Sequence, residues 1–178
     1  MALAPPEPQV AVLGDYLERC RALAPAFRWV APAGVHLTLR FLGGVEAAAL
    51  DSVSARLRRV RQAPFLLSLD GLGGFGGRRP SVLFLGLGEG REPAAALARE
   101  VETACVAAGL PPETRPFRGH LTLARSRERS GAPRPDLPPP PELEPWTATE
   151  MILFESKLGG GPPTYIPLER FPLEAELP

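Results

Sequence analysis

The stretch GHLTLAR, residues 119–125, has a close copy earlier in the chain, VHLTLR, residues 35–40. The protein has 178 residues and only 2 histidines, and each histidine opens one of these His-Leu-Thr-Leu segments. A short motif is a weak signal when it occurs once, but a pair that uses every histidine of the chain is specific. We therefore interpret the two stretches as two halves of one active site.

Both stretches have the composition and the flanking glycines of β-strands, and we predict strands over residues 35–42 and 119–125. Side chains alternate between the two faces of a strand. The histidine and the threonine of each stretch should therefore share a face, with Arg40 beside the first pair. The leucines and Phe41 should form the opposite, apolar face and pack into a core. The polar faces are left to line a groove.

Hydrophobic spacing and turn residues predict the other elements. Helices are expected at residues 7–23, 46–61 and 92–108, the last capped by Gly109. Further strands are expected at residues 27–30, 65–71, 81–87, 146–154 and 165–173, with Pro167 marking the last as an edge strand. Glycine-rich turns are expected at residues 71–80 and 159–163, and a charged, proline-rich surface loop at residues 126–145.

This order of elements and the repeated motif favour an α+β fold. We expect two lobes with antiparallel sheets that face a central cleft, helices packed on the outside, and a pseudo-two-fold duplication that relates the motifs. No shift in composition marks a linker, so residues 1–178 should form a single bilobal domain.

Composition excludes several classes of protein. The 20 basic and 20 acidic residues balance, so no whole-molecule field attracts nucleic acid or an anionic membrane. The cysteines, Cys20 and Cys105, and the histidines lack metal-ligand spacing, and we expect neither a metal nor a cofactor. The chain shows no signal peptide and no apolar run long enough to span a membrane, so we expect a cytoplasmic protein without a membrane partner.

Two imidazoles in one groove can divide acid–base work, because the ordinary pKa of histidine lies near neutral pH. One ring can accept a proton while the other donates one. The two threonine hydroxyls can donate hydrogen bonds to an anionic oxygen between the rings. No nucleophilic serine or cysteine lies beside either histidine in the sequence. The residues therefore indicate metal-free hydrolysis of a phosphodiester, or its reversal.

The paired motifs resemble those of the 2H phosphoesterase superfamily, and within it the bacterial and archaeal 2′-5′ RNA ligase family, also called RNA 2′,3′-cyclic phosphodiesterases. The similarity runs from about residue 3 to about residue 173. Besides the motifs, it includes residues 70–75, 79–87, 115–118 and 153–156, and Tyr165.

The resemblance implies two α+β lobes around a cleft and an enzyme that opens a terminal 2′,3′-cyclic phosphate on RNA to a 2′-phosphate. It implies that His36 and His120 are catalytic, that Thr38 and Thr122 bind phosphate, and that Arg125 faces the phosphate or ribose. We expect His120 to activate water and His36 to protonate the departing 3′ oxygen. The reverse reaction would join a cyclic phosphate to a 5′ hydroxyl, which gives a 2′-5′ linkage without ATP.

Arg40 and Tyr165 are further candidates for substrate contact, and we expect a monomer whose partners are RNA ends or nucleotides with a 2′,3′-cyclic phosphate. Two features depart from the family. Only Ala2-Leu3-Ala4 stands where an apolar first strand is usual, and Gly119 stands where Pro commonly precedes the second histidine. Two alternatives stay open: a non-catalytic RNA- or nucleotide-binding module on the same fold, and a phosphodiesterase for a small cyclic nucleotide.

Overall fold

The computed structural model describes residues 1–157, 159 and 163–175; most of the turn predicted at residues 159–163 lies outside this range. In the described part, the helices are α1 (Glu7–Leu23), α2 (Ala47–Leu57) and α3 (Arg91–Ala107), with a 3-10 turn, η1 (Pro32–Gly34). The strands are β1 (Ala2–Leu3), β2 (Phe27–Trp29), β3 (Leu37–Thr38), β4 (Phe65–Leu67), β5 (Leu69–Phe75), β6 (Val82–Leu87), β7 (His120–Ser126), β8 (Trp146–Ala148), β9 (Glu150–Lys157) and β10 (Thr164–Pro172).

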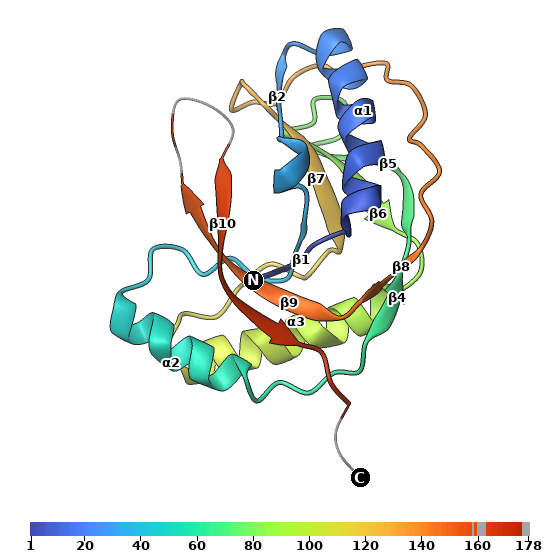
Figure 1. Ribbon diagram of the computed structural model, residues 1–178. Coiled ribbons are helices and arrows are strands. Elements are labelled where there is room, and N and C mark those ends of the chain that lie inside the picture. Colours follow the sequence, from blue (N-terminus) through green and yellow to red (C-terminus); the bar gives the residue numbers. More distant parts are fainter. Residues whose placement is uncertain (158, 160–162, 176–178) are drawn as a thin grey trace.

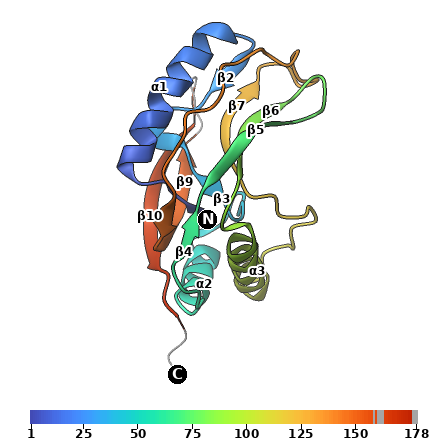
Figure 2. The same ribbon diagram turned by 90° about the vertical axis from the view of Figure 1, so that its right-hand side faces the viewer.

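The strands form two antiparallel sheets, which confirms the predicted α+β class. The larger sheet has 8 strands in the order β10-β9-β1-β3-β7-β6-β5, with β2 also paired to β7, and the smaller sheet pairs β4 with β8. The two motif strands, β3 and β7, are direct neighbours in the larger sheet. Helices α2 and α3 lie together at one end of the molecule, and α1 lies apart from them against the other half (Figures 1 and 2).

The three residues at the beginning of the chain build a strand in the middle of the sheet. Ala2 pairs with Thr38 on one side and with Ile152 on the other, and Ala2 and Leu3 are each 2% exposed. The Met1 carbonyl then accepts hydrogen bonds from the amides of both Leu39 and Arg40, at 2.9 and 3.2 Å. The short segment therefore supplies the apolar first strand expected from the resemblance.

The first motif strand is shorter than predicted, two residues instead of residues 35–42. Only Val35 and His36 separate it from η1. After Thr38, two successive amides converge on the single Met1 carbonyl, which no regular ladder allows. The alternation of side chains is lost beyond this point. Arg40 is buried, at 6% exposed, and Phe41 is 57% exposed, so the predicted positions of these two residues are both wrong.

The glycine-rich segment predicted as a turn at residues 71–80 is strand as far as Phe75, and the turn begins at Gly76. One of these glycines, Gly73, faces an aromatic ring of the neighbouring strand. A Cβ added at Gly73 would lie 2.4 Å from the ring of Phe84 on β6. Strand β6, predicted at residues 81–87, pairs with β5 on one side and with β7 on the other.

Two predicted strands are each divided between the two sheets. The chain leaves the small sheet and enters the large one after Ser68, between β4 and β5, and again at Thr149, between β8 and β9. Strand β10 lies at an end of the large sheet with a register irregularity between Pro167 and Glu169, as predicted for an edge strand.

The helices follow the predictions closely. Helix α1 has the predicted bounds, and α3 differs by one residue at each end and is followed by Gly109 with φ of 93°. Helix α2 ends at Leu57 rather than residue 61, because the amide of Arg59 bonds to the carbonyl of Arg56 and closes a tighter turn. Residues 127–145 contain no helix or strand, as predicted for the proline-rich loop.

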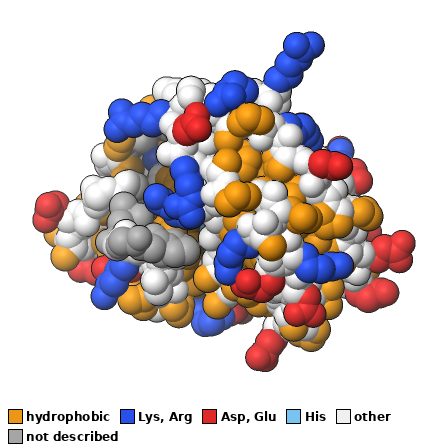
Figure 3. All heavy atoms as spheres, turned by 90° about the horizontal axis from the view of Figure 1, so that it is seen from above, with side chains coloured by type: hydrophobic (Ala, Val, Ile, Leu, Met, Phe, Trp, Pro, Cys, Tyr) orange, Lys and Arg blue, Asp and Glu red, His pale blue; other side chains and the backbone are white. Residues whose placement is uncertain are grey.

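The distribution of charged side chains on the surface agrees with the balanced composition. In the view from above, basic and acidic side chains are mixed over the same face (Figure 3). Within the described residues, no helix combines the length and the apolar character that crossing a membrane would need.

Candidate active site

The register between β3 and β7 brings the two motifs together. Leu37 pairs with Leu121, and both side chains are at most 1% exposed because they point into the core. In antiparallel strands the residues on either side of such a pair project from the opposite face. The histidine and threonine of each motif therefore meet on one surface, as the alternation of the sequence predicts. We call these four residues the quartet: His36, Thr38, His120 and Thr122.

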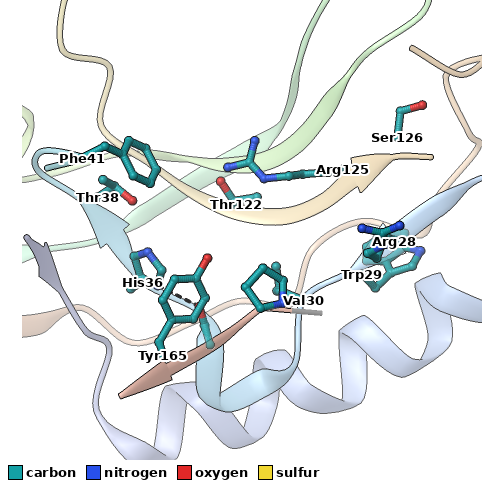
Figure 4. A pocket seen from close by; sticks show the side chains of 12 residues that line it. Arg28, Trp29, Val30, His36, Thr38, Phe41, Thr122, Arg125, Ser126 and Tyr165 are labelled. Atoms are coloured by element: carbon teal, nitrogen blue, oxygen red, sulfur yellow. Dashed lines mark hydrogen bonds between the residues drawn. The ribbon is translucent and has the colours of Figure 1, made fainter. Parts of the chain in front are cut away.

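The quartet lies between two cavities. The first has a volume of about 90 Å³ and includes His36, Thr122 and Tyr165 in its lining (Figure 4). The second has a volume of about 770 Å³ and includes His120. Thr38, Phe41 and Arg125 line both cavities, which places them where the two spaces meet. Each cavity thus contains one histidine of the pair.

Both imidazole rings are held in the same way. Nδ1 of His36 lies 2.8 Å from the carbonyl oxygen of Gly34, and Nδ1 of His120 lies 2.6 Å from that of Arg118. A carbonyl oxygen only accepts, so Nδ1 carries the proton and donates in both rings. The Nε2 atom of each ring is left to take or to give a proton. The same contact two residues back in each motif supports the predicted duplication.

Burial favours the neutral form of both histidines. Desolvation lowers the pKa of His36 from 6.5 to about 4, against the opposing effect of the Gly34 carbonyl. The chain's amino terminus and the positive charge of Arg125 lower the pKa of His36 further. Desolvation is also the main cause that lowers the pKa of His120, and Arg125 adds to it. An anion bound between the rings would act in the opposite direction on both pKa values.

Aromatic rings enclose His36 from the side of β9 and β10. The ring of Tyr165 meets it edge-on at 4.5 Å between centroids, and the ring of Phe154 lies at 5.8 Å. Tyr165, a candidate from the sequence, therefore reaches the site across the sheet. Phe154 was not predicted, and its place opposite β10 depends on a long-range pairing that periodicity does not reveal.

Two phenylalanines enclose His120 in the same manner. The rings of Phe75 and Phe84 lie 5.0 and 5.1 Å from the imidazole and 4.5 Å from each other. Sequence reasoning missed both as parts of the site. The signal that could have found them is the glycine run before Phe75, since Gly73 leaves the space that the ring of Phe84 fills.

A β-bulge turns Arg125 toward the groove. Strict alternation would place Arg125 on the face opposite Thr122. However, Leu83 and Phe84 on β6 pair with Ala124 and Thr122 on β7, so β7 contains one extra residue at this point. A bulge of this kind re-aims the side chains that follow it. The guanidinium of Arg125 therefore lines the same surface as Thr122, and it is drawn beside that hydroxyl in Figure 4.

Arg40, the other predicted arginine, is held elsewhere. Its buried guanidinium forms an ion pair with Glu102 on α3, and its Nη2 donates to the carbonyl of Pro111 at 2.6 Å. These contacts tie the end of the first motif to α3. The expectation that Arg40 points with His36 fails because the strand ends at Thr38, so we do not count Arg40 among the substrate contacts.

Packing determines the positions of two further residues near the site, Trp29 and Gly119. Trp29 is 2% exposed, and its Nε1 donates to the carbonyl of Ala24 at 3.2 Å, so it packs in the core. Gly119 carries no positive φ; a Cβ there would lie 2.5 Å from Leu87. In the described part of the chain, no three His, Cys, Asp or Glu side chains are grouped closely enough to hold a metal ion.

The sheet thus presents two histidines, two threonines and an arginine on one surface. Residues 5–155 match the model of the 2′-5′ RNA ligase superfamily, and the chain belongs to this family.

Similar proteins carry one function in their names. The RNA 2′,3′-cyclic phosphodiesterase of Escherichia coli (strain K12) is 33% identical over 148 residues, which cover 83% of this chain and 81% of that protein. The protein of the same name from Thermus thermophilus is 34% identical over 159 residues, covering 83% and 76%.

Solved structures agree with this family. E. coli LigT complexed with NADP⁺ superposes with a TM-score of 0.81 at 30% identity, over 97% of this chain and 95% of that one. TT0787 of Thermus thermophilus gives a TM-score of 0.82 at 31% identity, over 99% and 97%.

Proposed function

We propose that this protein is an RNA 2′,3′-cyclic phosphodiesterase, which opens a terminal 2′,3′-cyclic phosphate to a 2′-phosphate. One observation supports this above all others. Two histidines, each with Nδ1 bonded to a carbonyl and Nε2 left for proton transfer, lie in adjoining cavities with a threonine hydroxyl beside each. The names of the relatives point to the same reaction.

In the proposed step, His120 Nε2 removes a proton from a water molecule as its oxygen attacks phosphorus. The bond between phosphorus and the 3′ oxygen breaks, and His36 Nε2 gives its proton to that oxygen. The product is a 2′-phosphate and a free 3′ hydroxyl. Attack and departure on opposite sides of phosphorus suit two histidines in two adjoining cavities.

The remaining residues stabilise the charge on phosphorus. The hydroxyls of Thr38 and Thr122 donate to the non-bridging oxygens, where negative charge develops, and fixed donors of this kind are a large source of catalysis. The planar guanidinium of Arg125 offers paired donors to the same group. Tyr165, edge-on to His36, is the remaining contact that we propose for the substrate.

Binding of the substrate would cause His36 to take up a proton. The protein alone gives this ring a pKa of about 4, so the ring is neutral at pH 7 and cannot serve as an acid. A bound phosphate anion beside the ring favours the charged form and raises this pKa. The acid is thus prepared by the anion on which it acts.

The proposed chemistry uses neither a metal ion nor ATP. The same site run in reverse joins a 2′,3′-cyclic phosphate to a 5′ hydroxyl and gives a 2′-5′ linkage. We propose further that residues 1–178 act as one bilobal domain and as a monomer on RNA ends in the cytoplasm.

The test is hydrolysis of a short RNA that ends in a 2′,3′-cyclic phosphate, in buffer with EDTA, with the phosphate position assigned by ³¹P NMR. We expect a 2′-phosphate, and a fall in kcat of about 10³-fold or more in His36→Ala and in His120→Ala, because each removes one proton-transfer partner. Nucleotide binding without turnover in the unaltered protein would show a binding module instead. Turnover of small cyclic nucleotides but not of RNA ends would change the substrate class.

A further inference from the structure

The cavity beside His120 is far larger than its role in hydrolysis requires. Its volume is about 770 Å³, and a water molecule needs roughly 30 Å³. The cavity beside His36 is much smaller, at about 90 Å³. Pockets that hold nucleotide-sized ligands have volumes of roughly 300 to 1,000 Å³. If His120 activates the nucleophile, the nucleophile's side of the site has room for more than water.

The charges around this larger cavity favour an anionic occupant. Two arginines in its lining, Arg40 and Arg115, are neutralised by Glu102 and Glu113. Three others form no ion pair with any residue that the structure describes: Arg99, Arg118 and Arg125. With both glutamates engaged, the lining therefore has an excess of positive charge, which suits the phosphates of a nucleotide.

The same cavity presents aromatic surfaces. Phe75 and Phe117 are half-buried in its wall, and Phe41, 57% exposed, stands where the two cavities meet. Unpaired bases are commonly bound by stacking on such rings, while arginines hold the adjacent phosphates. Aromatic rings and unpaired arginines in one cavity are what a nucleotide requires.

We propose that the cavity beside His120 binds the nucleotide that carries the attacking 5′ hydroxyl, at the end of a second RNA strand. The proposal rests on the proposed function, because it assigns the nucleophile to the side of His120. In ligation, His120 takes the proton of the 5′ hydroxyl, the 5′ oxygen bonds to phosphorus, and the bond to the 3′ oxygen breaks as His36 protonates it. In the reverse reaction, the 3′ hydroxyl gives its proton to His36 and its oxygen bonds to phosphorus. The bond between phosphorus and the 5′ oxygen then breaks, and His120 protonates that oxygen.

The reverse reaction gives the cleaner experiment. The substrate is a trinucleotide in which a 2′-5′ linkage precedes a normal 3′-5′ linkage, so that the departing 5′-hydroxyl fragment carries a phosphate of its own. We expect the double variant Arg99→Gln, Arg118→Gln to raise KM for cleavage of the 2′-5′ linkage about tenfold. The backbone carbonyl of Arg118 that holds His120 is kept in this variant. Arg99→Gln alone, which leaves Arg118 unaltered, should raise the same KM by a smaller factor and should leave hydrolysis of a 2′,3′-cyclic mononucleotide unchanged.

Two comparisons make the result decisive. The matched control is Arg56→Gln, Arg59→Gln, which removes two exposed arginines near α2 that line neither cavity, and it should leave KM unchanged for every substrate. A dinucleotide that ends in a cyclic phosphate tests the competing occupant. If the double variant weakens only that substrate, the cavity holds the upstream nucleotide and the proposal is wrong. The proposal also fails if the double variant has the KM of the unaltered protein for every substrate. Absence of any turnover by the unaltered protein would instead refute the proposed function itself.

Discussion

At the residue scale, the two histidines are equivalent in their backbone contacts and different in their burial. Each donates Nδ1–H to the carbonyl two residues earlier. The pKa of His36 nevertheless falls to about 4, since burial acts on it together with the chain's amino terminus and the charge of Arg125. Two groups with the same tautomer and different environments are a usual basis for dividing acid and base roles.

The threonines of the quartet give the sharpest residue-scale prediction. Thr122→Val keeps the shape of the side chain and removes the hydroxyl, and Thr38→Val does the same in the other motif. Each variant should lower kcat for cyclic phosphate hydrolysis by roughly 10²-fold, because one fixed donor to the developing charge is lost. Steady-state kinetics with the same RNA would measure this. Thr147→Val, exposed on β8, is the control, and equal rates in all three variants would show that the hydroxyls do not act on phosphate.

Much of the site could be predicted at this scale, and the exceptions have local causes. The period of a strand was enough to put the histidine and threonine of each motif on one face. Arg125 lies beside them only because of a bulge between β6 and β7, which alternation alone would not give. Arg40 and Phe41 exchanged the expected faces because the strand ended at Thr38, where the chain begins to bond to Met1.

At the scale of elements, the helices were the most predictable parts and the strands the least. Helix periodicity fixed α1 and α3 to within one residue. The strand β5 was hidden by its glycines, which signal a turn when read alone and which here make room for Phe84. Likewise, the chain changes sheets at Thr149, between β8 and β9, with no glycine or proline in residues 146–157 to mark the point.

The ion pair between Arg40 and Glu102 joins the first motif to α3 and should be important for stability. The side chain of Arg40 is 4% exposed and that of Glu102 is 30% exposed. Glu102 also accepts a hydrogen bond from the amide of Glu113 at 2.9 Å. Glu102→Ala leaves a buried guanidinium without its counter-charge, and we expect the free energy of unfolding to fall by about 3 kcal/mol. Urea denaturation would measure the change.

The control for this prediction lies on the same helix. Glu100 is exposed and makes no ion pair among the described residues, so Glu100→Ala should change the free energy of unfolding by no more than about 0.5 kcal/mol. Similar values for the two variants would mean that Arg40 finds other partners when Glu102 is removed.

At the scale of the whole molecule, one sheet connects the two halves through the active site. Strand β1 lies between β3 and β9, and β3 pairs with β7, so the sheet order runs across both motifs. The duplicated motif predicted the two halves, but not that they share a sheet, because the pairing of Ala2 with Ile152 joins the beginning of the chain to its end. A substitution that disturbs this pairing should therefore also shift the quartet, which lies on the adjoining strands.

The buried histidines also make the stability of the whole molecule depend on pH. The pKa of His36 is about 4 in the folded protein, against 6.5 ordinarily. Below pH 6.5 the unfolded chain binds a proton that the folded chain does not bind, so stability falls as the pH decreases from 6.5 toward 4. Between pH 7 and pH 5 this loss should be roughly 2 kcal/mol for His36, and His120 acts in the same direction.

Urea denaturation of the unaltered protein and of His36→Asn at both pH values would isolate the contribution of His36. The variant keeps His120 and every carboxylate, so its free energy of unfolding should fall by roughly 2 kcal/mol less than that of the unaltered protein over this range. Equal losses in the two proteins would mean that His36 titrates in the folded state near its ordinary pKa. The imidazole would then be protonated without help from the substrate, and the proposed dependence of its acid role on the bound phosphate would be lost with it.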